Sequence, residues 1–76
     1  MAAIVFAGYG YSTQTKDVTT IVKNGYGLGV RKFVANNTSF GGDPAPGKVK
    51  DLFIVWQQNG STTSAVVQEG ESIALP

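Results

Sequence analysis

The segment of residues 40–60 constrains the fold more than any other part of this chain. It begins with a loop in which Pro44 and Pro46 lie among glycines, and each proline fixes its own φ angle and lacks an N–H donor. The loop leads into residues 49–57, the most strand-like run in the sequence, and an Asn-Gly pair typical of two-residue hairpin turns follows. The sequence therefore predicts a rigid loop followed by a β-hairpin.

The turn at Asn59 and Gly60 also fixes the register of this hairpin. The opposing pairs are Gln58 with Ser61, Trp56 with Thr63, Ile54 with Ala65 and Leu52 with Val67. We expect the face that carries Trp56 to be the core. The other face, with Phe53 and Val55, is also apolar, so we expect a second sheet or another subunit to cover it.

The first third of the chain has weaker signals. Residues 3–7 predict a strand that Gly8 and Gly10 interrupt, and the polar residues 11–16 predict a loop. Asp17 is a suitable N-cap for one or two helical turns over residues 18–23, and Asn24 with Gly25 would end them. Because this stretch is rich in β-branched residues, a short extended segment is the alternative.

The remaining segments complete the predicted strand set. A strand is expected within residues 28–34 and a turn at 36–39, whereas residues 41–47 can form neither a helix nor a central strand. A turn at 69–71 precedes a last short strand over 72–75. The sequence predicts a single all-β domain over residues 1–76, a small antiparallel β-sandwich of immunoglobulin-like or jelly-roll-like type with five or six short strands.

Composition excludes several classes of function. The chain has no cysteine and no histidine, which removes disulfides, Cys/His metal sites and Ser/His or Cys/His nucleophilic catalysis. Its five acidic residues include no convincing catalytic pair, since only Asp51 and Glu69 are expected to be near each other. We therefore expect no enzyme activity, no metal and no cofactor.

Charge and hydropathy limit the partners. The six basic residues are scattered, whereas nucleic-acid binding needs a basic patch. The apolar N-terminal run is too short to span a bilayer and has no basic residues before it, so we expect no membrane association and a cytoplasmic location. Charged residues make up only 14%, and such a surface resists self-association weakly, so a homo-oligomer is expected.

A set of aromatic and polar residues in predicted loops could bind a ligand. Sugars stack apolar ring faces on aromatic side chains and present hydroxyls to amides and carboxylates. The candidate ligand-binding residues are Tyr9, Tyr11, Tyr26, Asn36, Asn37 and Asp43. The competing interpretation is that the aromatic rings pack in the core and that Asp43 caps its own loop through backbone amides.

Other motifs are interpreted as structural. The glycines of residues 25–29 suit turns or bulges better than a phosphate-binding loop, because no Lys-Ser or Lys-Thr pair follows them. The residues expected to have structural roles are Asp17, Pro44, Gly47, Trp56, Asn59 and Gly60.

The order of these motifs resembles a known family. Tyr9-Gly10 is followed by Asp17-Val18-Thr19, and then by a Phe-x-x-Asp-Pro-x-x-Gly-x-x-Lys-x-Leu block that runs from Phe40 to Leu52. This pattern is similar to that of a small β-rich domain of unknown function at the C-terminus of some J-domain (DnaJ-like) proteins, which also occurs alone or appended to bacterial and fungal proteins. Since the sequence contains no J-domain, the resemblance implies an adaptor or recognition module and transfers no catalytic residues.

Two kinds of function therefore remain. The first is a lectin-like module in which a self-associating small β domain binds carbohydrate. The second is a protein-interaction domain, as the family resemblance implies, or a structural subunit with no small-molecule ligand.

Overall fold

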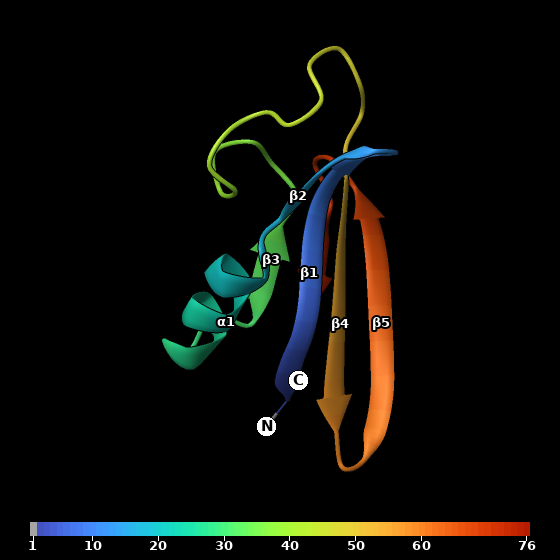
Figure 1. Cartoon of the computed structure of the whole chain (residues 1–76). Coiled ribbons are helices and arrows are strands. Elements are labelled where there is room, and N and C mark those ends of the chain that lie inside the picture. Colours follow the sequence, from blue (N-terminus) through green and yellow to red (C-terminus); the bar gives the residue numbers. More distant parts are fainter. Residues whose placement is uncertain (1) are drawn as a thin grey trace.

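A four-stranded antiparallel sheet dominates the computed structural model, which describes residues 2–76. Its strands are β1 (Ala3–Tyr11), β2 (Gln14–Asp17), β4 (Asp51–Gln58) and β5 (Ser61–Gln68), in the order β2-β1-β4-β5. Figure 1 shows β1, β4 and β5 running side by side. The strands β1 and β4 are thus paired on both sides, while β2 and β5 form the two edges of the sheet.

The β4–β5 hairpin has the register that the sequence predicts. Trp56 lies opposite Thr63, and Ile54 lies opposite Ala65. Asn59 and Gly60 have φ angles of 54° and 81°, which a type I′ turn requires at both central positions. The prediction that Trp56 points into the core is also confirmed, because its side chain is buried.

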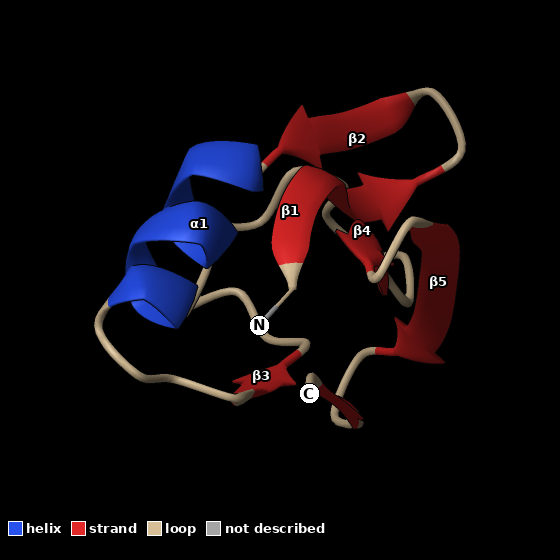
Figure 2. Ribbon diagram, turned by 90° about the horizontal axis from the view of Figure 1, so that it is seen from below, coloured by secondary structure: helices blue, strands red, loops and turns tan. Residues whose placement is uncertain are grey.

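A second layer packs against one face of this sheet. It consists of the helix α1 (Thr19–Gly27) and a two-stranded antiparallel sheet of β3 (Lys32–Val34) and β6 (Ser72–Ala74). Figure 2 shows α1 and β3 facing β1 and β4 across the interior. The core between the layers includes Tyr9, Leu52, Ile54 and Trp56 from the large sheet and Val22, Tyr26, Phe33 and Ile73 from the second layer.

The first strand is longer than expected. Gly8 and Gly10 do not interrupt this strand. They allow neighbouring groups to pack closely against its backbone and do not form a turn. A Cβ atom on Gly8 would lie 2.6 Å from Cε1 of Phe53, and one on Gly10 would collide with the carbonyl of Gln14. The predicted loop over residues 11–16 is also wrong, since β2 folds back on β1 after a tight turn in which Ser12 has a φ of 51°.

The helix begins almost where the sequence places it but runs further. Asp17 accepts a hydrogen bond from the backbone N–H of Thr19 at 2.9 Å, while Val18 holds the N-cap position itself. The predicted stop at Asn24 and Gly25 is wrong, because α1 continues to Gly27. The reason is tertiary: Val22 and Tyr26 lie on one side of the helix and are both buried in the core.

The strand expected within residues 28–34 is reduced to its last residues. The backbone N–H of Leu28 bonds to the carbonyls at the end of α1, and the N–H of Val30 bonds to the carbonyl of Gly25. These donors end the helix and are unavailable to a strand. By contrast, residues 41–47 form neither helix nor strand, as expected, and Gly47 has a φ of +79°.

The described residues therefore form a mostly antiparallel β-rich domain with one short helix, and the coarse fold prediction is confirmed. Within residues 2–76, no helix combines the length and the apolar character needed to cross a bilayer.

Removal of one methyl group should destabilise the protein much more at a core position than at a surface position. Ile54 is 0% exposed at the centre of β4, so Ile54→Val should lower the free energy of unfolding by about 1 kcal/mol. Ile21→Val removes the same group from a side chain that is 38% exposed, and it should change the free energy of unfolding by less than about 0.5 kcal/mol. Urea denaturation followed by Trp56 fluorescence measures both. Equal effects would contradict the assignment of the core.

Candidate functional site

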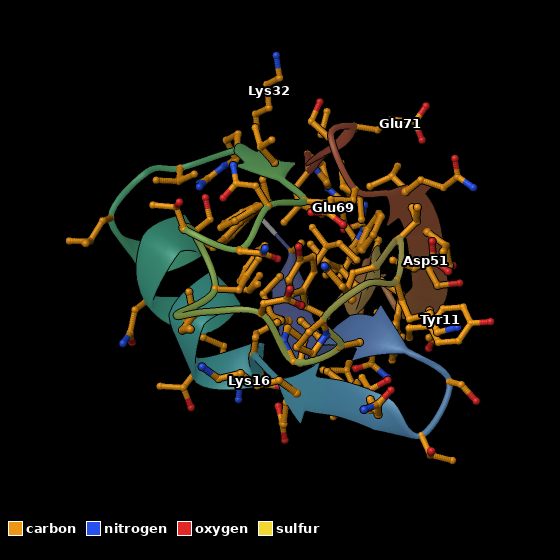
Figure 3. The ribbon with its side chains drawn as sticks, turned by 90° about the horizontal axis from the view of Figure 1, so that it is seen from above. Tyr11, Lys16, Lys32, Asp51, Glu69 and Glu71 are labelled. Atoms are coloured by element: carbon orange, nitrogen blue, oxygen red, sulfur yellow. The ribbon has the colours of Figure 1, made fainter. Side chains whose placement is uncertain are left out.

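A pocket opens between α1, β3 and the segment that follows β3. Its volume is about 320 Å³. The lining residues are Ile21, Gly25, Val30, Lys32, Phe33, Val34, Asn36, Ser39 and Phe40. Most of these side chains are apolar, while Asn36 and Ser39 supply an amide and a hydroxyl group. The ammonium of Lys32 extends away from the protein (Figure 3). Pockets that bind small molecules have this combination of an apolar wall with a few polar groups.

The close packing of α1 against β3 shapes the inner wall of this pocket. A Cβ atom on Gly25 would lie 3.0 Å from Cε1 of Phe33, so the helix can approach the strand this closely because residue 25 is glycine. Phe33 and Phe40 are buried, whereas Ile21, Val30 and Val34 are partly exposed. The buried rings therefore form the floor, and the aliphatic side chains form the rim.

The amide side chain that lines the pocket belongs to Asn36, which also holds a tight turn. Its side-chain oxygen accepts a hydrogen bond of 2.7 Å from the backbone N–H of Ser39. This bond holds the turn and uses only the oxygen of the amide. The side-chain nitrogen of Asn36 remains the donor that a ligand in the pocket could use.

Tyr9 and Asn37 support this turn from inside. The hydroxyl of Tyr9 donates a 2.7 Å hydrogen bond to the side-chain oxygen of Asn37. The ring of Tyr9 packs on Phe40 with the ring centroids 5.2 Å apart, and burial raises the pKa of the Tyr9 hydroxyl above its usual value. Since Tyr9 is buried, its ring has no free face on which a sugar could stack.

Tyr26 also has a structural position. Its hydroxyl accepts a hydrogen bond from the backbone N–H of Ala2 and donates one to the carbonyl of Pro76, each 2.8 Å long. The guanidinium of Arg31 lies 3.7 Å from the centre of its ring, a cation–π contact. Tyr26 therefore joins α1 to residues near both ends of the chain, which lie together in Figure 1.

Tyr11 is the one candidate tyrosine with an accessible ring. It is 44% exposed, and the ammonium of Lys48 lies 5.5 Å from the ring centre. Tyr11 does not line the pocket, and Figure 3 shows it at the right edge of the molecule, well away from Lys32 at the upper edge. A ligand of monosaccharide size could not contact both.

Asp43 is held in an ion-pair cluster that closes the loop between β3 and β4. Its carboxylate lies 2.9 Å from the ammonium of Lys50, and Glu69 lies 3.3 Å from the same ammonium. Asp43 also accepts a hydrogen bond from the backbone N–H of Ala45, as expected of a loop cap. The side chain of Lys50 is only 5% exposed, so the two carboxylates neutralise a cation that could not remain buried alone.

These contacts shift the ionisation of the cluster. The hydrogen bond to Lys50 holds the pKa of Asp43 below its usual value, and the hydrogen bond to Asp43 raises the pKa of Lys50. In the described part of the chain, no group of three acidic residues is arranged to hold a metal ion. The cluster has the character of a structural clamp.

The structure thus brings one of the six candidate ligand-binding residues, Asn36, to the pocket. Tyr9, Tyr26 and Asn37 are engaged in the internal contacts above, and Asp43 is paired with Lys50. The sequence reasoning missed the pocket walls, including Ile21, Val34 and Ser39. The apolar residues on both faces of the predicted strand over residues 28–34 were the only available signal for them.

Comparison with known proteins adds no relative: no family model, no curated protein and no solved structure matches this chain.

Removal of the buried ammonium tests the clamp. Lys50→Met should destabilise the protein at pH 7, because it leaves Asp43 and Glu69 without their shared cation. Since the folded-state pKa of Asp43 is lowered, its contribution is present above about pH 4 and is lost as the pH falls through the folded-state pKa. The difference in stability between wild type and Lys50→Met should therefore shrink in acid.

Urea midpoints at pH 7 and pH 3 measure this effect. Lys48→Met is the matched control, because it removes a lysine on the same loop that has no ion pair among the described residues. A gap between wild type and Lys50→Met that stays constant with pH would rule out the clamp as described.

Proposed function

We propose that this protein is a non-catalytic recognition module that binds carbohydrate in the pocket between α1, β3 and Asn36. The observation that carries this proposal is the convergence of three partly exposed aliphatic side chains, Ile21, Val30 and Val34, on a pocket that is also lined by an amide and a hydroxyl residue, Asn36 and Ser39. Exposed apolar groups gathered in one concave place mark a binding site.

The chemistry of the pocket suits a sugar. The C–H face of a pyranose ring can lie against the aliphatic rim, and its hydroxyls can accept from the amide of Asn36 and bond to the hydroxyl of Ser39. The volume of about 320 Å³ is near the lower limit of small-molecule sites. It therefore fits one monosaccharide unit, and binding to a single site should be weak.

Self-association would strengthen such weak binding. Two or more pockets on one assembly convert later binding events into intramolecular ones, which raises the apparent affinity for a repeated glycan. As part of the same proposal, the large sheet and the β3–β6 pair form a minimal β-sandwich of immunoglobulin-like or jelly-roll-like type, which is supported by core residues from both sheets.

A glycan array with the folded protein tests the proposal, followed by NMR titration with the monosaccharide of the strongest binder. Asn36→Asp keeps the oxygen that accepts from Ser39 but removes the amide donors, so the turn should persist while binding weakens by about tenfold or more. Gln14→Glu is the control: it makes the same change at an exposed position outside the pocket.

Binding that is equally weak in both variants would point to a general charge effect and contradict the assignment of Asn36. No binding to any glycan at high concentration of folded protein would refute the proposal as a whole.

A second candidate function is a protein-interaction domain, and the outer face of the large sheet favours it. Phe6 and Phe53 lie there with their ring centroids 5.5 Å apart, and neither side chain is fully buried. Val55 is adjacent on β4, and Val66 on β5 is 64% exposed. An apolar face of this kind could dock a partner protein.

Val55→Lys places a charge in the middle of that face, and it should abolish binding of such a partner while leaving glycan binding intact. Affinity capture with the wild type, Val55→Lys and the exposed helix variant Thr20→Lys measures this difference. A captured protein that binds all three equally does not use the outer face.

A further inference from the structure

We propose that the free edge of β5 pairs with the same edge of a second copy, in an antiparallel register centred on Ser64. This inference rests on the self-association that forms part of the proposed function, and it names the surface and the register that produce it. The sheet order leaves β5 with one neighbour, β4, so its other edge has no partner strand within residues 2–76.

The hairpin register shows which backbone groups lie at this edge. A two-residue turn makes Gln58 and Ser61 a hydrogen-bonded pair, and bonded and non-bonded pairs alternate along an antiparallel ladder. Thr62, Ser64, Val66 and Gln68 are therefore in non-bonded pairs and direct both N–H and C=O away from β4. The N–H of Gln68 confirms this phase, because it bonds to the carboxylate of Glu71 and not to β4.

The contact with Glu71 ends the free edge at Gln68 and leaves the groups of Thr62, Ser64 and Val66 open. These positions are symmetric about Ser64. In an antiparallel pair of two β5 strands, Ser64 lies opposite its own copy and Thr62 lies opposite Val66, and each such pair exchanges two hydrogen bonds. The same surface on both partners is what a two-fold symmetric dimer requires.

Proteins normally protect exposed edges with charges, prolines, bulges or short strands. The β5 strand has none of these over its eight residues: Ser61–Gln68 contains no charged residue and no proline, and its pairing with β4 has no register shift. Two such edges can approach without repulsion between like charges.

The other edge of the sheet provides the contrast within the same molecule. The strand β2 has four residues and carries Lys16 and Asp17 side by side. The ammonium of Lys16 also bonds to the carbonyl of Phe40, which ties β2 to the neighbouring loop. The edge at β2 is therefore short and charged, while the edge at β5 is long and neutral, and this difference selects β5 as the site of pairing.

Sedimentation velocity over a range of protein concentrations tests the proposal, with a concentration-dependent dimer as the expected result. Ser64→Pro removes the central N–H without removing a bond of the β4–β5 hairpin, and Ser64→Lys places two like charges opposite each other at the two-fold axis. Both variants should weaken self-association by at least about tenfold. Thr20→Lys adds the same charge at an exposed position of α1, and it should leave self-association unchanged.

Amide hydrogen exchange distinguishes edge pairing from packing through the outer face of the sheet. Exchange at Thr62, Ser64 and Val66 should slow as the concentration rises. A chain that stays monomeric, a dimer that both Ser64 variants leave intact, or a dimer in which these three amides still exchange rapidly would each overturn the proposal.

The test of edge pairing can be separated from the test of glycan binding in the pocket. Ser64 does not line the pocket, so a monomeric Ser64 variant should keep single-site binding of the monosaccharide in NMR titration and lose only the gain from multivalency. A wild-type protein that forms the dimer but binds no glycan would instead contradict the proposed function, and the proposed edge pairing would still hold.

Discussion

The burial of one face of β4 is the constraint on which the other elements depend. Leu52 and Ile54 are fully buried, and Trp56 nearly so, between two paired strands and the layer of α1, β3 and β6. Because alternate residues of a strand point to opposite faces, this burial fixes the register of the hairpin, and a slip by one residue would expose the whole set. The position of β1, with Gly8 packed against Phe53, follows from the same strand.

The long connection between β3 and β4 links this core to the candidate site. At its start, Tyr9 reaches through the core to hold Asn37, and the turn at Asn36 completes the wall of the pocket. At its end, Lys50 joins Asp43 to Glu69 and closes the loop onto the end of β5. Buried polar groups at both ends thus hold a segment that has no regular secondary structure, and they are satisfied by internal partners.

The polar residues of this small domain divide between two tasks. Most aromatic hydroxyls and amides that looked suited to a ligand are used to fasten loops and chain ends, as with Tyr26 and Tyr9. A chain with few charges and no disulfide must obtain such fastening from hydrogen bonds and a few ion pairs. The groups that we propose for recognition are those at the pocket and along the neutral edge of β5.

The sequence by itself determined the hairpin of β4 and β5, the inward side of Trp56, the irregular loop over residues 41–47 and the β-rich class, because turn residues and two-residue alternation are local signals. Only the tertiary structure decided that Gly8 and Gly10 lie within a strand, that α1 runs past Gly25, and that Tyr9 and Tyr26 are internal fasteners. For Gly8, Tyr9 and Tyr26, the deciding contact comes from a residue distant in sequence, such as Phe53 against Gly8 and Pro76 against Tyr26. Local patterns carry no information about such partners, and the pocket, which is assembled from three separate segments, could be found only once they were packed together.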